Sequence, residues 1–163
     1  MTQISNPPES GVLLTWWARL ARFPAGKRLF SLALGRMAPY TGTIGARVEQ
    51  LECGQARVRM RDRRRLRNHL HSLHAIALIN LGELATGLAV LTTLSSNMRG
   101  IVLGIEAEYL KKARGPITAN AAFNLPEILE ADTPCAVEAD LTDETGETVA
   151  RVRATWLLGY QSA

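Results

Sequence analysis

The feature that most constrains this chain is a long apolar run with one acidic residue near its middle. Residues 75–91, AIALINLGELATGLAVL, hold a single charged residue, Glu83. On a helix these residues give an apolar surface on nearly every side: Leu78, Leu81, Ala85 and Leu88 on one, with Ile76, Ile79 and Val90 over much of the rest. A helix of this kind belongs in a protein interior. We therefore expect it to be wrapped by a sheet.

The ends of this helix can be placed from local signals. Ser72 is of a residue type that caps helix starts. We therefore predict a helix that begins near Leu73, is capped by Ser72 and runs to about Leu94.

The segments around the helix have the two-residue period of half-buried strands. Apolar residues alternate with charged ones, as Val58 and Met60 do with Arg57 and Arg59. Such alternation is typical of antiparallel strands with one face on the core. We predict six strands, two before the helix and four after it: residues 43–52, 54–62, 101–110, 116–125, 135–142 and 148–159.

The order of the elements predicts the fold class. Residues 1–10 are predicted to be disordered, and residues 11–22 and 27–37 to form two N-terminal helices. The sequence thus predicts an α+β protein, with a six-stranded antiparallel sheet curled around one long central helix. We expect a single domain overall, with the helical pair at 11–38 and the main body at 39–160.

Composition agrees with a folded protein that needs no disulfides. Of 163 residues, 47% are hydrophobic and 21% are charged, which is ordinary for a globular chain. The two cysteines, Cys53 and Cys135, indicate a reducing compartment. No export signal is evident. The first apolar run, broken by Arg19 and Arg22, is too short to span a membrane. We expect a cytoplasmic protein without a membrane partner.

The net charge of +4 and the pI of about 9.5 come partly from RDRRRLR, residues 61–67. Three interpretations are open: a solvated strand end, a nucleic-acid patch, or a site for a phosphorylated carrier such as coenzyme A. No recognition motif accompanies the charge. We therefore expect no nucleic-acid partner.

All three histidines, His69, His71 and His74, lie within six residues. Three histidines can hold zinc. Here, however, no carboxylate or cysteine stands at the usual ligand spacing, and the pattern HxHxxH alone is weak. We predict no metal site.

Glu83 invites a chemical role because a buried carboxylate is costly unless it is paired or used. One interpretation is structural: Glu83 hydrogen-bonds Asn80 one turn back, or a backbone group across an interface. The other is catalytic, because burial raises a carboxyl pKa toward the range of a general base. We favour the catalytic interpretation.

The start of the helix supplies further groups. Backbone N–H groups near His74 and Ala75 lie at the positive end of the helix dipole and can hold an oxyanion. Asn68 can orient water or a carbonyl group. With Glu83 as the base, these parts describe hydrolysis by acyl transfer.

His74 and Glu83 cannot meet within one chain. Nine residues of helix separate them by about 13 Å and half a turn. If they act together, Glu83 must come from a second copy of the helix. A two-fold dimer with antiparallel helices at its interface would form two equal sites.

The segment NHLHSLHAIALINLGELATG resembles the core motif of hotdog-fold thioesterases. In the PaaI-like branch the motif has Asn, then His six residues on, then Gly-Gly, with an acidic residue fifteen after the Asn. Asn68, His74 and Glu83 match these offsets. With the N-terminal WWARLARFPAGKRLFSLALG, residues 10–160 most closely resemble the DUF4442 group of that superfamily.

The resemblance implies a dimeric or tetrameric enzyme that hydrolyses acyl-CoA or acyl-carrier-protein thioesters without a metal. Glu83 would be the base or nucleophile and Asn68 would position water or substrate. His74 and the N–H of Ala75 would bind the thioester carbonyl. Ala75-Ile76 replaces Gly-Gly, so Ile76 narrows the approach.

The phosphates of a coenzyme A substrate would need cations to bind them. Apart from coenzyme A as part of the substrate, we expect no cofactor. The candidates are Arg65, Arg67, Lys111, Lys112 and Arg114. Trp16, Trp17 and Phe30 suggest that the N-terminal helices form a lid over an acyl tail.

Two other functions fit the same sequence. A hotdog dehydratase or hydratase would depend on His74 more strongly than a hydrolase does. A non-catalytic acyl-CoA or lipid binder is favoured by the replacement of Gly-Gly.

Overall fold

The computed structural model describes residues 11–127 and 132–161. The disorder expected for residues 1–10 lies outside this part of the chain. Within it, no helix is long and apolar enough to cross a membrane.

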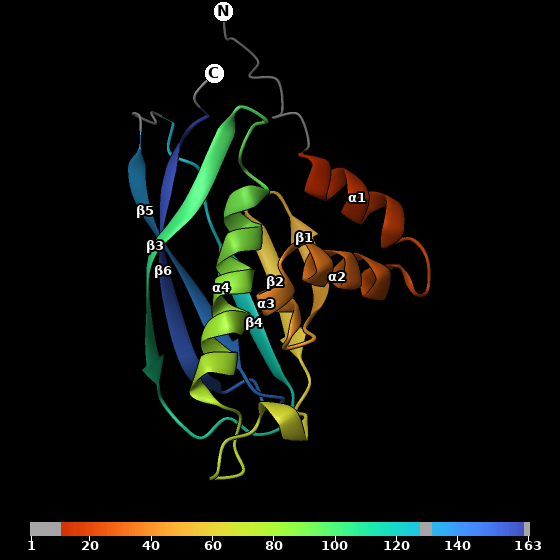
Figure 1. Cartoon of the computed structure of the whole chain (residues 1–163), viewed down its shortest axis with the longest axis vertical. Coiled ribbons are helices and arrows are strands. Elements are labelled where there is room, and N and C mark those ends of the chain that lie inside the picture. The colour runs from red at the N-terminus through yellow and green to blue at the C-terminus, as the bar shows by residue number, and fades with distance from the viewer. Residues whose placement is uncertain (1–10, 128–131, 162–163) are drawn as a thin grey trace, which may run out of the picture.

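Six antiparallel strands form one sheet in the order β1-β2-β4-β5-β6-β3 (Figure 1). β1 and β3 are therefore the two edge strands. The strands are β1 (Arg47–Glu52), β2 (Gln55–Met60), β3 (Met98–Tyr109), β4 (Ile117–Ala122), β5 (Thr133–Thr142) and β6 (Thr148–Tyr160).

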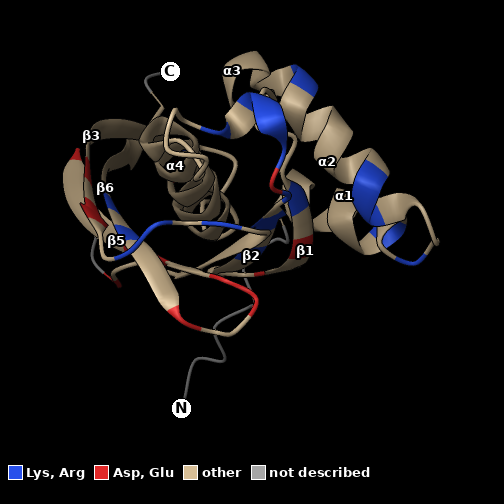
Figure 2. Ribbon diagram, turned by 90° about the horizontal axis from the view of Figure 1, so that it is seen from below, with Lys and Arg blue, Asp and Glu red and all other residues tan. Residues whose placement is uncertain are grey.

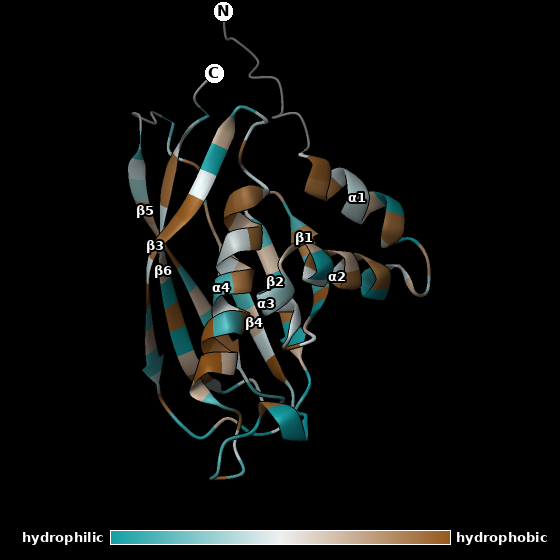
Figure 3. Cartoon of the chain, in the orientation of Figure 1, coloured by the Kyte–Doolittle hydropathy of each residue, from teal (hydrophilic) through white to brown (hydrophobic). Residues whose placement is uncertain are grey.

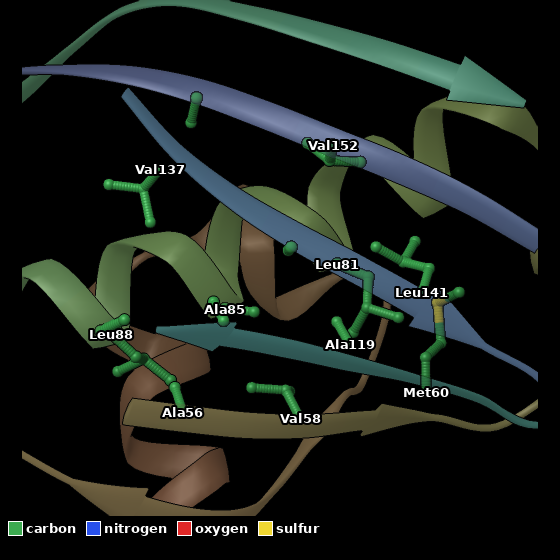
Figure 4. Close-up of a cluster of buried hydrophobic side chains, with 14 of the residues drawn as sticks. Ala56, Val58, Met60, Leu81, Ala85, Leu88, Ala119, Val137, Leu141 and Val152 are labelled. Carbon is green, nitrogen blue, oxygen red and sulfur yellow. The ribbon is translucent and has the colours of Figure 1, made fainter. Parts of the chain in front are cut away.

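The sheet curls around one long helix, α4 (Ala75–Leu91), as the end-on view in Figure 2 shows. The predicted α+β architecture is thus confirmed. Apolar side chains from the concave face of the sheet meet Leu81 and Ala85, which are fully buried (Figure 4). The alternation read from the sequence is also confirmed, because Val58 and Met60 point into this core.

Gly82 allows α4 to lie close to β6. A Cβ atom at this position would stand 2.4 Å from the Cβ of Val152, which is fully buried on β6. Real Cβ atoms do not approach so closely, so any larger residue would push the helix off the sheet. The small residue sets the depth at which the next residue, Glu83, sits.

The predicted helix start was wrong by two residues. His74, not Ser72, is the N-cap, because its ring Nδ1 accepts a hydrogen bond from the Ile76 N–H at 3.1 Å. Ser72 instead donates its N–H and its hydroxyl to the side-chain oxygen of Asn68. The helix also ends earlier than expected, at Leu91 instead of about Leu94.

The N-terminal helices are α1 (Val12–Leu20) and α2 (Gly26–Met37), and a third short helix, α3 (Pro39–Gly42), was not predicted. A single 3-10 turn, η1 (Arg64–Leu66), follows β2. The Trp17 and Phe30 rings pack edge to face with centroids 5.2 Å apart, which joins α1 to α2. The Ser31 hydroxyl accepts from the Val48 N–H, and Lys27 donates to the Glu49 carbonyl, so α2 is fixed to the β1 edge.

Helix α4 is not buried on all sides within one chain, contrary to the expectation from its composition. Ile76 and Leu91 are exposed, and Ile79 and Glu83 are half-buried. These positions follow one another at helical spacing and form an open face. The hydropathy colours of Figure 3 show apolar segments along the length of α4. The part of the helix that the sheet does not cover is therefore largely apolar.

Candidate functional site

The loop before α4 is held by a carboxylate. Asp62 accepts hydrogen bonds from Arg67 Nε at 2.7 Å and from the Gly115 N–H at 3.0 Å. The hydrogen bond from Arg67 holds the pKa of the Asp62 carboxyl below its usual value, against the opposing effect of burial. Arg67 and Leu73 form an isolated antiparallel bridge that closes the loop. Asn68 is thereby placed next to the start of α4.

Asn68 holds this loop through its side-chain oxygen, while its side-chain nitrogen stays available to a ligand. Its Oδ1 accepts from the Leu70 N–H at 2.9 Å, and from the N–H and hydroxyl of Ser72. Two of these donors are backbone N–H groups, which fixes the amide orientation. Within the described residues its Nδ2 makes no hydrogen bond. Asn68 can therefore donate to a substrate carbonyl or to a water oxygen.

The first turn of α4 presents one available backbone donor. The Ile76 N–H is occupied by His74 Nδ1, and those of Ala77 and Leu78 by the His74 carbonyl. The Ala75 N–H has no acceptor within the described residues. Because His74 Nδ1 accepts, a neutral His74 carries its proton on Nε2. The exposed Nε2–H and the Ala75 N–H are thus both donors at the positive end of the helix.

Glu83 lies two turns further along, on the open face of α4. Burial among apolar neighbours raises the pKa of its carboxyl above the usual value. No cation within the described residues forms an ion pair with it. A carboxyl desolvated in this way holds its proton more readily than an exposed one, as a general base must.

Of the two partners that a structural Glu83 could have, Asn80 is not one within this chain, and the other, a backbone group across an interface, stays a prediction. Asn80 Nδ2 donates instead to the carbonyl of Tyr40 on α3, at 3.4 Å. Asn80 Oδ1 is buried without a partner among the described residues. The amide of Asn80 therefore links α3 to α4 and does not neutralise Glu83.

The two sets of groups lie at different levels of α4, one at the helix start and the loop before it, the other further along the helix. Asn68, His74 and Ala75 gather at its start, whereas Glu83 is nine residues beyond His74. A straight helix separates these positions by about 13 Å and half a turn. Within one chain, Glu83 therefore does not reach the groups at the helix start.

A cleft of about 1480 Å³ opens between α2, α3, β1 and α4, and Glu83 is on its wall. Its lining is apolar near α4, with Leu84, Leu88, Leu91 and Trp156. Arginines line it toward β2 and η1, among them Arg61, Arg63 and Arg65. The cleft therefore combines an apolar region next to Glu83 with a cationic one.

The cations proposed for carrier phosphates do not form one group. Arg65 lines the cleft and donates to the Thr43 carbonyl at 3.1 Å. Arg67 is engaged by Asp62, and Lys111 by Asp143 and Glu147. Lys112 and Arg114 are exposed on the loop between β3 and β4. Of these five residues, Arg65 alone lines the cleft with Glu83.

The sequence reasoning missed Tyr109, at the end of β3. Its hydroxyl donates to the carbonyl of Ala75 at 3.2 Å, so it holds the edge strand against the start of α4. Partial burial raises the pKa of this phenol. No motif marks the residue, because the contact joins positions 34 apart in sequence.

Three histidines in six residues do not gather into a ligand set. His69 and His71 are exposed, and His71 has the left-handed backbone conformation, with φ of 56°. Within residues 11–127 and 132–161, no group of three or more His, Cys, Asp or Glu side chains could hold a metal ion.

The sequence matches the model of a known protein family. Residues 26–158 match the family model DUF4442, a domain of unknown function. The chain belongs to the DUF4442 family. Its six-stranded sheet and central helix are the hotdog fold. No curated protein matches the sequence.

Solved structures place this DUF4442 protein near thioesterases. A structural genomics protein, APC5556, is 28% identical with a TM-score of 0.78, over 91% of this chain and 98% of its own. PA5026 of Pseudomonas aeruginosa, described as a probable thioesterase, is 31% identical with a TM-score of 0.71, over 78% of this chain and 91% of its own. The thioesterase HI1161 of Haemophilus influenzae, at 19% identity and a TM-score of 0.66 over 78% and 88%, shares the fold.

Proposed function

We propose that this protein hydrolyses acyl thioesters, carried by coenzyme A or an acyl-carrier protein, as a two-fold dimer. The observation that carries the proposal is Glu83, a carboxyl partly desolvated on the open apolar face of α4, which forms no ion pair with a cation in residues 11–127 or 132–161. The likeness to thioesterases supports the same chemistry.

A dimer through β3 would complete each site. β3 is a long edge strand without Lys or Pro, and it exposes Ile101, Leu103 and Ile105 by 49%, 57% and 37%. Such an edge is a template for pairing with another strand. A shift in register after Val102 turns Ile105 toward the α4 side of the sheet, since Ile105 pairs with the buried Ala154 of β6. Pairing of two β3 strands would cover this edge and bring the open faces of two α4 helices together.

Each composite site would then combine Glu83 of one protomer with the helix start of the other. The Glu83 carboxylate would take a proton from water as the water oxygen attacks the thioester carbonyl carbon. The resulting oxyanion would accept from the Ala75 N–H and His74, with Asn68 orienting the substrate or the water. On collapse the C–S bond breaks, and the leaving thiolate takes the proton from Glu83.

A second candidate function is acyl binding without turnover. The Ile76 N–H is occupied by His74 Nδ1, and Ala75-Ile76 stands where the motif has Gly-Gly. The oxyanion site therefore has one free backbone donor. Removal of one such donor costs about 100-fold or more in known enzymes, so a slow enzyme or a pure binder fits this detail.

The test is release of free thiol from short, medium and aromatic acyl-CoAs and from an acyl-carrier protein. We expect turnover by the wild type and a loss of at least about 100-fold in Glu83→Gln. Glu52→Gln, an exposed carboxylate on β1, is the matched control and should keep full activity.

The other variants separate the alternatives. His74→Ala should weaken a hydrolase but abolish a dehydratase or hydratase, which is assayed on the matching enoyl substrate. Equal activity in Glu83→Gln and the wild type would refute the proposed base. Stoichiometric acyl-CoA binding with no product would favour the binder.

A further inference from the structure

The positive charge of the chain is concentrated in its N-terminal helices. Residues 11–42 contain five basic residues and no acidic one: Arg19, Arg22, Lys27, Arg28 and Arg36. Residues 43–163 hold 14 basic and 14 acidic residues, so the rest of the described body is close to neutral. This separation is visible in Figure 2, where α1 and α2 carry blue segments and no red ones.

The same helices expose large apolar side chains. Six of them are exposed to solvent by about half or more: Val12 70%, Trp16 45%, Phe23 66%, Leu29 54%, Leu32 51% and Met37 68%. Brown and teal segments alternate along α1 and α2 in Figure 3. Exposed apolar side chains in this number on two helices that pack together indicate a surface that meets a partner. We call residues 11–37 the N-terminal face.

Four of the five cations are directed to the outside. Lys27 is turned inward, with its ammonium 2.6 Å from the Glu49 carbonyl and over the ring of Trp17. The other four cations, all of them arginines, are exposed, and none forms an ion pair with any residue in 11–127 or 132–161. The positive charge of the N-terminal face is therefore available to a partner.

The face is placed where a dimer through β3 would leave it free. α1 and α2 pack on β1, and β1 and β3 are opposite edges of the sheet. The face is also continuous with the cleft, because Leu32 and Met37 are exposed and line it together with Glu83. A partner of this face would thus meet the cleft opening.

We propose that the N-terminal face docks on an anionic lipid bilayer, with its apolar side chains in the headgroup region. Exposed Trp, Phe and Leu side chains interspersed with arginines are the composition of interfacial helices, and each arginine near an anionic surface adds to the attraction. This revises the expectation of a protein without a membrane partner. The helices would lie on the bilayer and not cross it.

Charge decides between lipid and a second copy of the chain. A two-fold contact through the N-terminal face would bring two identical positive surfaces together, and like charges oppose such a contact. An anionic bilayer has the complementary sign and accepts apolar side chains. Docking does not depend on hydrolysis, although it would present acyl substrates of the bilayer to the cleft.

The experiment is co-sedimentation of the full chain with phosphatidylcholine vesicles, with and without phosphatidylglycerol, at low and high salt. We expect binding to the anionic vesicles alone, weakened by salt. Arg28→Glu with Arg36→Glu, and separately Leu29→Ser with Leu32→Ser, should each weaken binding by more than about tenfold. Arg57→Glu with Arg114→Glu, two exposed arginines elsewhere, is the matched control and should bind like the wild type.

All changed positions are exposed, so the variants should fold, and circular dichroism checks this. Absence of binding at low salt would overturn the proposal, as would equal weakening by the control pair. A third result would also overturn it. The wild type would form an assembly larger than a dimer and bind no vesicles, and Leu29→Ser with Leu32→Ser would reduce that assembly to a dimer. The face would then be a contact between copies. Thiol release from soluble acyl-CoA, measured separately, tests the hydrolase and not the docking.

Discussion

At the scale of single residues, Glu83 combines a cost in stability with the chemical role that we propose for it. Its carboxyl lies on a helix face that apolar residues dominate, and burial raises its pKa. A group whose pKa is higher in the folded state than in the unfolded state favours folding while it is protonated. That contribution is lost as the pH rises through the folded pKa. Stability and activity therefore make opposite demands on this position.

We expect Glu83→Gln to be more stable than the wild type at pH 8 and close to it at pH 4. The amide has no charge to desolvate, so the gain at pH 8 should be about 1 kcal/mol, within the range of stabilising substitutions. Urea unfolding at the two pH values, at one protein concentration, measures the difference. An equal effect at both values would mean that the carboxyl is solvated in the folded protein.

The pH dependence of activity follows from the same residue. The base must be ionised, so thiol release should fall at acid pH, along a limb set by a pKa above the usual glutamate value. The profile of kcat/KM against pH locates this limb in the free enzyme. A limb that persists in the residual activity of Glu83→Gln would assign it to another group.

Sequence could identify these residues but not all their partners. Glu83 could be recognised because a lone carboxylate in an apolar helix is costly to bury. His74 and Asn68 could be recognised because their spacing matches a known motif. The hydrogen bond of Asn80 to Tyr40 spans 40 residues, and the pairing of Lys111 with Asp143 spans 32. Such contacts depend on the packed fold, so the phosphate candidates Lys111 and Arg67 could not be separated from Arg65 beforehand.

At the scale of elements, hydrophobic period predicted which segments fold and local hydrogen bonds decided where they begin. The apolar run forms the central helix as predicted, although one face of that helix stays open. The helix starts at Ala75 and not at the predicted Leu73, because the ring of His74, and not the side chain of Ser72, caps it. α3 was missed because a four-residue helix shows no period.

The edge strand β3 allows a prediction at this scale. Ile105→Lys should separate the proposed dimer, because a two-fold interface would bury both copies of the lysine close together. We expect the dimer Kd to rise by about 100-fold or more, measured by sedimentation velocity. Val12→Lys, at an apolar position on α1 that is still more exposed, is the control and should leave assembly unchanged.

Activity of the same variant connects the element to the site. If the helix start and Glu83 act across the β3 interface, monomeric Ile105→Lys should lose thiol release together with assembly. A folded monomer with wild-type activity would place the whole reaction within one chain.

At the scale of the whole molecule, the geometry of α4 imposes a choice between one chain and two. Ideal helix geometry separates His74 and Glu83 by about 13 Å and half a turn. The hotdog sheet leaves one face of that helix open, beside an apolar edge strand. The proposed dimer would account for both facts, because the contact that covers the open face would also bring a second Glu83 to the helix start.

Heterodimers of defined composition test this choice. In the first, one chain carries Glu83→Gln and the other Asn68→Ala with His74→Ala, and two affinity tags isolate the mixed species. A composite site predicts one intact site of two, hence about half of the wild-type activity, although each homodimer is inactive. A site within one chain predicts no activity.

The second heterodimer joins a chain with all three substitutions to a wild-type chain, and its predictions are reversed. Each composite site would then lack one half, so no activity is expected. A site within one chain would survive in the wild-type partner and give about half of the full rate. Because the two species contain the same three substitutions, differently distributed between the two chains, differences in folding or expression cannot produce opposite outcomes. Activity in the first and none in the second would require that Glu83 acts on the substrate held by the other protomer.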